Sequence, residues 1–147
     1  MATELLKERI NPGIGVGVIV LNSDNQILLG KRISKFGRGM WCLPGGKVDP
    51  KKSVIEAGIR EVAEEAGISV KIEKFISTGY EKFYGLEYLT FGLITRSDEK
   101  PKATEPDAIG DWQYFPFSRL PGPLFGPSER IIRNYVKGVM RSEEPLG

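Results

Sequence analysis

The segment from Leu43 to Gly67 constrains the fold of this chain more than any other. It runs from a Pro-Gly-Gly turn into the strongest predicted helix of the sequence, Val54 to Ala66. Ser53 precedes this helix as its N-cap, and Glu56 follows three residues later, which is the spacing of a capping box. Gly67 stands where a C-terminal glycine ends a helix. We therefore predict a turn and a helix at a fixed separation, against which the rest of the chain packs.

The predicted helix has two different faces. Glu61, Glu64 and Glu65 lie at positions i, i+3 and i+4, so they share an arc roughly 100° wide. A separate apolar stripe is expected to face the core, and it consists of Ile55, Ile59, Val62 and Ala66. Three neighbouring carboxylates repel one another, and either Lys and Arg partners or a hard divalent cation such as Mg²⁺ or Mn²⁺ relieves that repulsion. On its own, this pattern is more typical of an exposed acidic face than of a metal site.

The rest of the chain predicts mostly strands. They cover residues 13–21, 26–32, 41–43, 70–81, 86–96 and 111–117, and a last helix covers 128–140. Loops are expected at 33–40 and 97–109. Strands outnumber helices and do not alternate regularly with them, which favours an α+β order with a mixed sheet between helices. With 147 residues, we expect a single domain over 1–147.

The composition excludes several kinds of chemistry. The chain has no histidine and one cysteine, Cys42, so it cannot hold a Ser-His-Asp triad, a His-ligated metal or an internal disulfide. Its 21 Lys and Arg against 19 Asp and Glu give a net charge of +2, which does not suggest a partner such as long nucleic acid. The apolar run 14–21 is too short to span a bilayer, and residues 1–10 lack the core of a signal peptide. We expect no membrane association and a cytoplasmic location.

The acidic helix and the segment before it match a known motif. The run from Gly46 through Lys52 to Arg60-Glu61-Val62-x-Glu64-Glu65-x-Gly67-Ile68 resembles the Nudix box, G-x5-E-x7-R-E-U-x-E-E-x-G-U, where U is a bulky aliphatic residue. Every fixed position matches except the first glutamate, which is Lys52. The resemblance extends over about residues 13–120 and is closest to the nucleotide-hydrolysing MutT-like branch.

The resemblance implies a fold and an activity. The fold is an α/β/α sandwich of the Nudix type, which is classed as α/β. The activity is Mg²⁺- or Mn²⁺-dependent hydrolysis of a phosphoanhydride bond in a nucleoside diphosphate linked to another group, in which water attacks phosphorus. A nucleoside triphosphate or diphosphate is the expected substrate. The alternatives are ADP-ribose or a nucleotide sugar, and a nucleotide-binding module with little or no turnover.

The resemblance also implies roles for individual residues. The metal ligands are the Gly45 carbonyl and the side chains of Glu61, Glu64 and Glu65. A further carboxylate comes from a downstream loop, where Glu105 is the first choice and Asp107 and Asp111 are the alternatives. Glu61, Glu64 or Glu105 orients or deprotonates the attacking water, and Arg60 helps to set the catalytic glutamate.

Lys52 replaces the first glutamate of the motif. In the family, that glutamate commonly pairs with the box arginine, here Arg60. A lysine cannot accept a hydrogen bond from Arg60. Glu56, one helical turn earlier, and Asp49 are the alternative partners. The sequence leaves three outcomes open: an active hydrolase with a compensating partner, a slow hydrolase, or a protein that binds nucleotide without useful turnover.

Substrate contacts are expected from a basic loop and from aromatic side chains. Among Lys31, Arg32, Lys35 and Arg38, the residues Arg32 and Arg38 are candidates for binding phosphate, as is Lys47 after the glycine pair. A base could stack on an aromatic ring in a loop, with candidates Phe36, Phe83, Tyr84 and Phe125. The last predicted helix carries an apolar stripe that could cover its own sheet or a second copy in a homodimer, formed by Ile131, Ile132, Tyr135, Val136 and Val139.

Overall fold

The acidic helix forms with the predicted bounds. The computed structural model describes residues 12–83 and 85–142. In it, α2 covers Val54–Ala66, the Ser53 side chain accepts a hydrogen bond from the Glu56 backbone N–H at 3.0 Å, and Gly67 is left-handed with φ of 68°. Local signals at both ends of this helix were therefore sufficient to place it.

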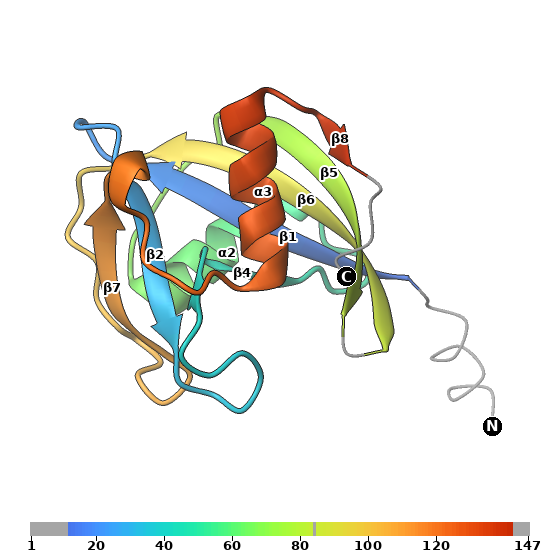
Figure 1. Cartoon of the computed structure of the whole chain (residues 1–147), viewed down its shortest axis with the longest axis horizontal. Coiled ribbons are helices and arrows are strands. Elements are labelled where there is room, and N and C mark those ends of the chain that lie inside the picture. The colour runs from blue at the N-terminus through green and yellow to red at the C-terminus, as the bar shows by residue number, and fades with distance from the viewer. Residues whose placement is uncertain (1–11, 84, 143–147) are drawn as a thin grey trace.

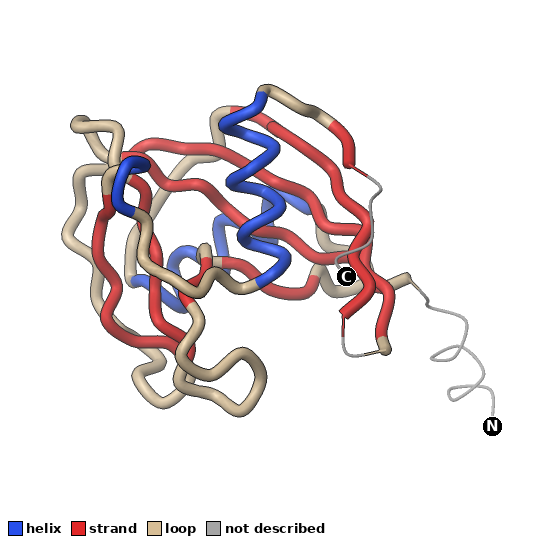
Figure 2. The backbone as a smooth tube through the Cα atoms, in the orientation of Figure 1, coloured by secondary structure: helices blue, strands red, loops and turns tan. Residues whose placement is uncertain are grey.

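A single mixed sheet forms the centre of the molecule (Figures 1 and 2). Its main path runs in the order β3-β2-β1-β6-β5-β8, while β4 pairs with β1 and β7 pairs with β2. The central pair, β1 and β6, is parallel, and its register runs from Gly13 opposite Tyr88 to Leu21 opposite Arg96. The strands are β1 Gly13–Leu21, β2 Ile27–Arg32, β3 Trp41–Cys42, β4 Gly45–Lys47, β5 Lys74–Phe83, β6 Leu86–Arg96, β7 Ile109–Phe115 and β8 Arg141–Ser142.

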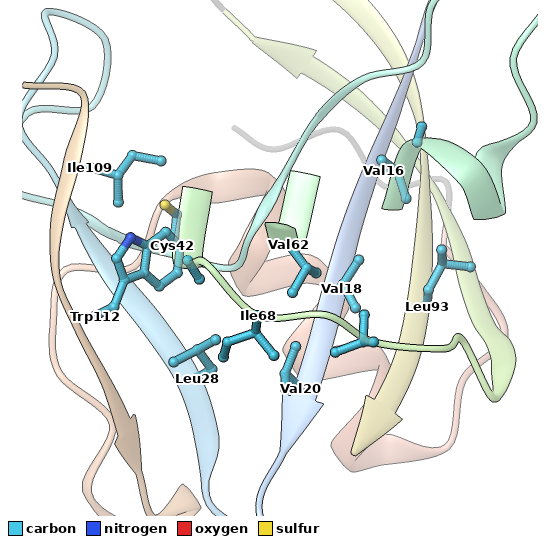
Figure 3. Close-up of a cluster of buried hydrophobic side chains, with 13 residues drawn as sticks. Val16, Val18, Val20, Leu28, Cys42, Val62, Ile68, Leu93, Ile109 and Trp112 are labelled. Carbon is cyan, nitrogen blue, oxygen red and sulfur yellow. The ribbon is translucent and has the colours of Figure 1, made fainter. Parts of the chain in front are cut away.

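Within residues 12–83 and 85–142, one helix covers each face of the sheet. Helix α3, Gly126–Lys137, crosses the front face in Figure 1, and α2 lies behind the sheet. Alternating residues of β1 supply both cores: Val18 packs in the cluster with Val62 of α2 (Figure 3), and Ile19 packs in the cluster with Ile131 of α3. This arrangement confirms the predicted α/β/α sandwich with its mixed sheet.

Several predicted bounds differ from the structure. Strand β5 begins at Lys74 instead of residue 70, and β7 begins at Ile109 and ends at Phe115. A short 3-10 helix, η1 (Phe117–Arg119), follows Pro116. Helix α3 begins two residues earlier than predicted and ends at Lys137, because Gly138 adopts a left-handed conformation with φ of 68°.

Two strands and part of the apolar pattern were predicted wrongly. Strand β4 was read as a turn, and β8 was not predicted. Ile55 was placed in the core stripe of α2 but is 40% exposed, and Val136 of the α3 stripe is 64% exposed. The sheet-facing side of α3 instead includes the polar residues Arg130 and Asn134.

Within the described residues, no helix is long and apolar enough to cross a membrane.

Candidate functional site

Gly45 lets strand β4 lie against the backbone of β1. The register places Gly45 opposite Gly17, and the Val18 N–H donates to the Pro44 carbonyl at 2.9 Å. A Cβ atom added at Gly45 would lie 2.2 Å from the Val16 carbonyl oxygen, which no side chain tolerates. The glycine is therefore required by a close approach of two strands, and that approach fixes the segment in front of the acidic helix.

Glu65 joins the acidic helix to this strand. Its carboxylate accepts a hydrogen bond from the Gly45 N–H at 2.8 Å, and the residue is only 8% exposed. Burial raises the pKa of Glu65 to about 8, and the Gly45 hydrogen bond and the charge of Arg32 only partly oppose this shift. The negative charges of Glu61 and Glu105 raise the same pKa further. The ionised form of Glu65 is therefore poorly stabilised by its surroundings, and a nearby cation would stabilise it.

Glu61 lies next to the second glycine of the pair. A Cβ atom at Gly46 would lie 2.9 Å from the carboxyl carbon of Glu61, so the glycine leaves room for this side chain. Nη2 of Arg60 donates to Glu61 at 3.0 Å. Burial raises the pKa of Glu61, while the hydrogen bond and charge of Arg60 lower it. Arg60 thus holds the carboxylate in place and stabilises its charge.

Arg60 has a second acidic partner, which the sequence left undecided. Its Nη1 donates to the Asp49 carboxylate at 3.1 Å, and its Nη2 also reaches the Lys47 carbonyl at 3.3 Å. Glu64 lies farther away, with 3.9 Å between its carboxylate and Nε of Arg60. Of the two predicted alternatives, Asp49 is the residue in contact with Arg60. The backbone N–H of Glu56 donates to the N-cap residue Ser53.

The loop after β6 brings a fourth glutamate close to the helix. The hydroxyl of Thr104 donates to the Glu64 carbonyl, and the Lys102 N–H donates to the Ala66 carbonyl at 2.8 Å. Glu105 follows directly, and its charge raises the pKa of both Glu61 and Glu65. Since the neighbouring Thr104 is bound to the helix, the loop places the Glu105 carboxylate close to Glu61 and Glu65.

The four glutamates provide suitable donors for a hard cation. Among residues 12–83 and 85–142, no three Asp, Glu, Cys or His side chains already stand in an arrangement that could hold a metal ion. Glu61 is bound by Arg60 and Glu65 by the Gly45 N–H, while the Glu64 side chain is 56% exposed. The donors are nevertheless all oxygens. The pKa values of Glu61 and Glu65 are raised, and a bound cation would lower them by stabilising the ionised carboxylates. The residues therefore fit Mg²⁺ or Mn²⁺ in charge and donor type.

A cavity of about 450 Å³ adjoins this face. Six of the predicted site residues line it: Arg32, Phe36, Gly45, Lys47, Glu65 and Phe125. Arg38 is exposed and does not contribute to the lining, so the expectation that it contacts the ligand gains no support from its position. Tyr84 lies outside the described residues, as does the side chain of Phe83.

Arg32 lines the cavity and lies over the ring of Phe125. Its Nε donates to the Phe36 carbonyl at 2.8 Å, and its guanidinium carbon lies 4.1 Å from the centre of the Phe125 ring. Its charge also lowers the pKa of Glu65 and of the buried Cys42 thiol, whose pKa burial raises to about 12. The Arg32 guanidinium is therefore positioned in the cavity by the Phe36 carbonyl and the Phe125 ring. Cys42 remains a neutral thiol.

Other cavity residues had no signal in the sequence. They come from β1, β6 and α3, and include Gly15, Tyr88, Thr90 and Ser128. The Ser128 hydroxyl accepts a hydrogen bond from the Leu43 N–H at 2.9 Å, two residues before Gly45. Such residues meet only when the sheet forms, so local patterns did not reveal them.

The raised pKa of Glu65 predicts a pH-dependent stability in the absence of divalent cations. From about pH 4.5 to 8, unfolding exposes Glu65 and releases its proton, so the free energy of unfolding falls as the pH rises. Glu65→Gln keeps an acceptor for the Gly45 N–H but cannot ionise. We expect the variant to match wild type near pH 5 and to be more stable near pH 8, by on the order of a few kcal/mol. Urea unfolding with a chelator at several pH values measures this difference, and a difference independent of pH would contradict it.

Comparison with known proteins matches most of this chain to one family. Residues 11–135 match the NUDIX domain. A Bacillus subtilis (strain 168) protein named "Putative 8-oxo-dGTP diphosphatase" is 35% identical over 125 residues, which are 84% of this chain and 80% of that protein. The "ADP-ribose pyrophosphatase" of Methanocaldococcus jannaschii is 37% identical over 144 residues, which are 87% of this chain and 75% of that protein.

Solved structures agree with the sequence comparisons. The crystal structure of a MutT NUDIX hydrolase from Burkholderia pseudomallei superposes with a TM-score of 0.74 at 28% identity. The match covers 84% of this chain and 97% of that structure.

Proposed function

Because this chain belongs to the Nudix family and is a Nudix hydrolase, we propose that it hydrolyses a phosphoanhydride bond in a nucleoside triphosphate or diphosphate. The observation that carries the proposal is the acidic end of α2. There Glu65 is bound to Gly45, Glu61 is bound to Arg60, and both lie within the electrostatic reach of Glu105. This face opens beside a cavity large enough for a nucleotide-sized ligand.

We propose that Mg²⁺, or Mn²⁺ in its place, is held by Glu61, Glu64, Glu65 and the Gly45 carbonyl. Such a cation neutralises phosphate charge and polarises the bond that breaks. Arg60 contacts Oε1 of Glu61 at 3.0 Å, and the exposed side chain of Glu64 would turn toward the same ion.

The chain's own groups then have separate tasks. Glu64 is the most exposed of the three helix carboxylates, and Glu105 lies on the loop facing them, so either can orient water and accept its proton. Arg60 fixes Glu61 through the 3.0 Å hydrogen bond. Lys47 and Arg32 line the cavity, where their charges attract phosphate oxygens. Catalysis in this arrangement comes from positioning and charge stabilisation of an in-line attack on phosphorus.

The cavity supplies the proposed site for the base. Phe36, Phe125 and Tyr88 provide aromatic surface, and Arg32 already stacks on Phe125 at 4.1 Å. A nucleoside triphosphate is favoured because the Bacillus subtilis relative is named for 8-oxo-dGTP. ADP-ribose is the second candidate because the Methanocaldococcus jannaschii relative is named for it.

A substrate panel tests this function. Wild-type protein is incubated with Mg²⁺ and nucleoside triphosphates, nucleoside diphosphates, ADP-ribose and nucleotide sugars, and phosphate products are measured beside calorimetric binding. We expect turnover of at least one class. Binding of a nucleotide without any product would instead identify a nucleotide-binding module and overturn the proposal.

Gly15→Ala tests whether the base occupies the cavity. An added Cβ atom meets Thr90 Oγ1 at 3.4 Å, an ordinary contact, so the fold accommodates it while the methyl group takes space in the cavity. We expect KM to rise about 10-fold or more with kcat little changed, since one extra methylene in a pocket has effects of that size. Thr90→Ser removes the methyl group 3.9 Å from the new Cβ and should lower KM again in the double variant. An unchanged KM in Gly15→Ala would place the base elsewhere.

A further inference from the structure

The guanidinium of Arg60 connects the helix to the turn that precedes it. One terminal nitrogen, Nη1, donates to Asp49 at 3.1 Å, and the other, Nη2, donates to Glu61 at 3.0 Å. Nη2 also reaches the Lys47 carbonyl at the end of β4, at 3.3 Å. Arg60 therefore links three separate parts of the chain: the turn, the end of β4 and the acidic face of α2.

The geometry points to Asp49 as a positioning residue for hydrolysis, acting through Arg60 on Glu61; this inference rests on the proposed function. A guanidinium is a rigid planar fork, so fixing one nitrogen restricts the direction of the other. With Asp49 in place, Nη2 is aimed at Glu61. Without it, Glu64 becomes the competing acid, since its carboxylate already lies 3.9 Å from Nε.

The turn explains why this task falls to Asp49. The Lys52 N–H donates to the Asp49 carbonyl at 3.1 Å, which closes the turn directly before α2. Lys51 adopts a left-handed conformation with φ of 67° within it. The sequence of the turn, Asp-Pro-Lys-Lys-Ser, contains one acid and two lysines, so Asp49 is the residue in it that can neutralise Arg60.

The Asp49–Arg60 pair contributes little to overall stability. The Asp49 side chain is 62% exposed and that of Arg60 is 32% exposed. Ion pairs this open to water usually have small effects on folding. A variant at Asp49 should therefore fold normally, which separates a loss of positioning from a loss of structure.

The first variant removes the charge of Asp49 with little change of shape. We expect Asp49→Asn to lower kcat by about 10-fold or more, with KM changed by less than about 3-fold, which is the size typical of groups that orient a metal ligand. The melting temperature should stay unchanged. Asp24→Asn, an equal change in the exposed β1–β2 turn, is the matched control and should leave kcat unchanged.

The second variant restores a carboxylate within the same turn. We expect Asp49→Asn combined with Lys52→Glu to recover most of the lost kcat, and Asp49→Glu alone to retain activity. An unchanged kcat in Asp49→Asn would overturn the inference. So would a loss that neither carboxylate recovers, because the defect would then not be the missing partner of Arg60.

A readout without turnover separates this inference from the proposed function. Nitrogen-15 NMR at low temperature follows the Nη1–H signal of Arg60, the group that donates to Asp49, identified by its absence in Arg60→Lys. We expect a sharp, slowly exchanging signal in wild type, its loss in Asp49→Asn and its return in the double variant. If wild type turns over no nucleotide of the panel, the hydrolase proposal fails, and this signal alone decides whether Asp49 holds Arg60. An unchanged signal in Asp49→Asn overturns the inference in either case.

Discussion

The Glu64→Gln variant should lose at least about 100-fold in kcat, since even changes to groups behind a metal ligand lower activity by 10- to 100-fold. Glutamine keeps the size and one oxygen of the side chain but removes its charge and its capacity to accept a proton. Glu64 is the most exposed carboxylate of the proposed ligand set, at 56%, and the hydroxyl of Thr104 contacts its backbone carbonyl and not its side chain. Folding should therefore be unaffected. Steady-state kinetics with Mg²⁺ and the best nucleotide of the panel measure the loss.

The control for this variant lies on the same helix. Glu56→Gln makes the same change on an exposed residue in the first turn of α2, whose backbone N–H is the group bound to Ser53. We expect it to retain full activity. Equal activity of Glu64→Gln and wild type would remove Glu64 from the site, and equal losses in both variants would point to a general effect of charge on the helix.

A buried ion pair outside the proposed ligand set should have the largest effect on stability. Glu81 of β5 is fully buried, and its carboxylate lies 2.9 Å from Nε of Arg130 on α3, whose side chain is 4% exposed. Gly79 makes room for the pair, because a Cβ atom there would lie 2.4 Å from Cδ of Arg130. Burial raises the pKa of Glu81, and Arg130 opposes that shift. Removing either partner leaves a charged group inside the protein.

We expect Arg130→Met to lower the free energy of unfolding by about 3–5 kcal/mol, as is typical when one partner of a buried pair is removed. Urea unfolding followed by circular dichroism measures this change. The double variant Glu81→Gln with Arg130→Met should recover a large part of the loss, because no buried charge is then left alone. If the single change costs less than about 1 kcal/mol, the pair behaves as an exposed one and the burial seen here is contradicted.

Local signals explain which parts of the fold were predictable. Ser53 and Gly67 define the ends of α2, and the run from Leu86 to Arg96 became β6 with the expected bounds. Strand β4 was missed because two glycines carry no side-chain pattern, and it becomes a strand only by pairing with β1. Pairing over such a distance in sequence leaves no local trace.

The candidate site was predicted in its residues but not in its environment. The spacing of Glu61, Glu64 and Glu65 predicted that they share one side of α2, but it carried no information on how deeply each is buried. In fact Glu65 is buried at 8% exposure, while the Glu64 side chain is 56% exposed, because β4 covers only one edge of that arc. Helical periodicity gives the direction of each side chain around the helix axis, but not which neighbouring element covers it.

The interior of α3 shows a similar limit. Its apolar stripe included Ile131 and Ile132, which are buried, but also Val136, which is exposed. Arg130 was not considered for the core because arginine is rarely buried without a partner. That partner, Glu81, lies 49 positions earlier in the sequence and meets Arg130 only through the packing of α3 on β5.

The most direct test of the proposed function is product release by wild-type protein that has been stripped of cations, in water enriched in heavy oxygen, before and after Mg²⁺ is added. The proposal predicts no release before addition, and afterwards hydrolysis that places one heavy oxygen on a phosphoryl product. Absence of product at every Mg²⁺ concentration, while calorimetry shows that the nucleotide binds, would contradict it.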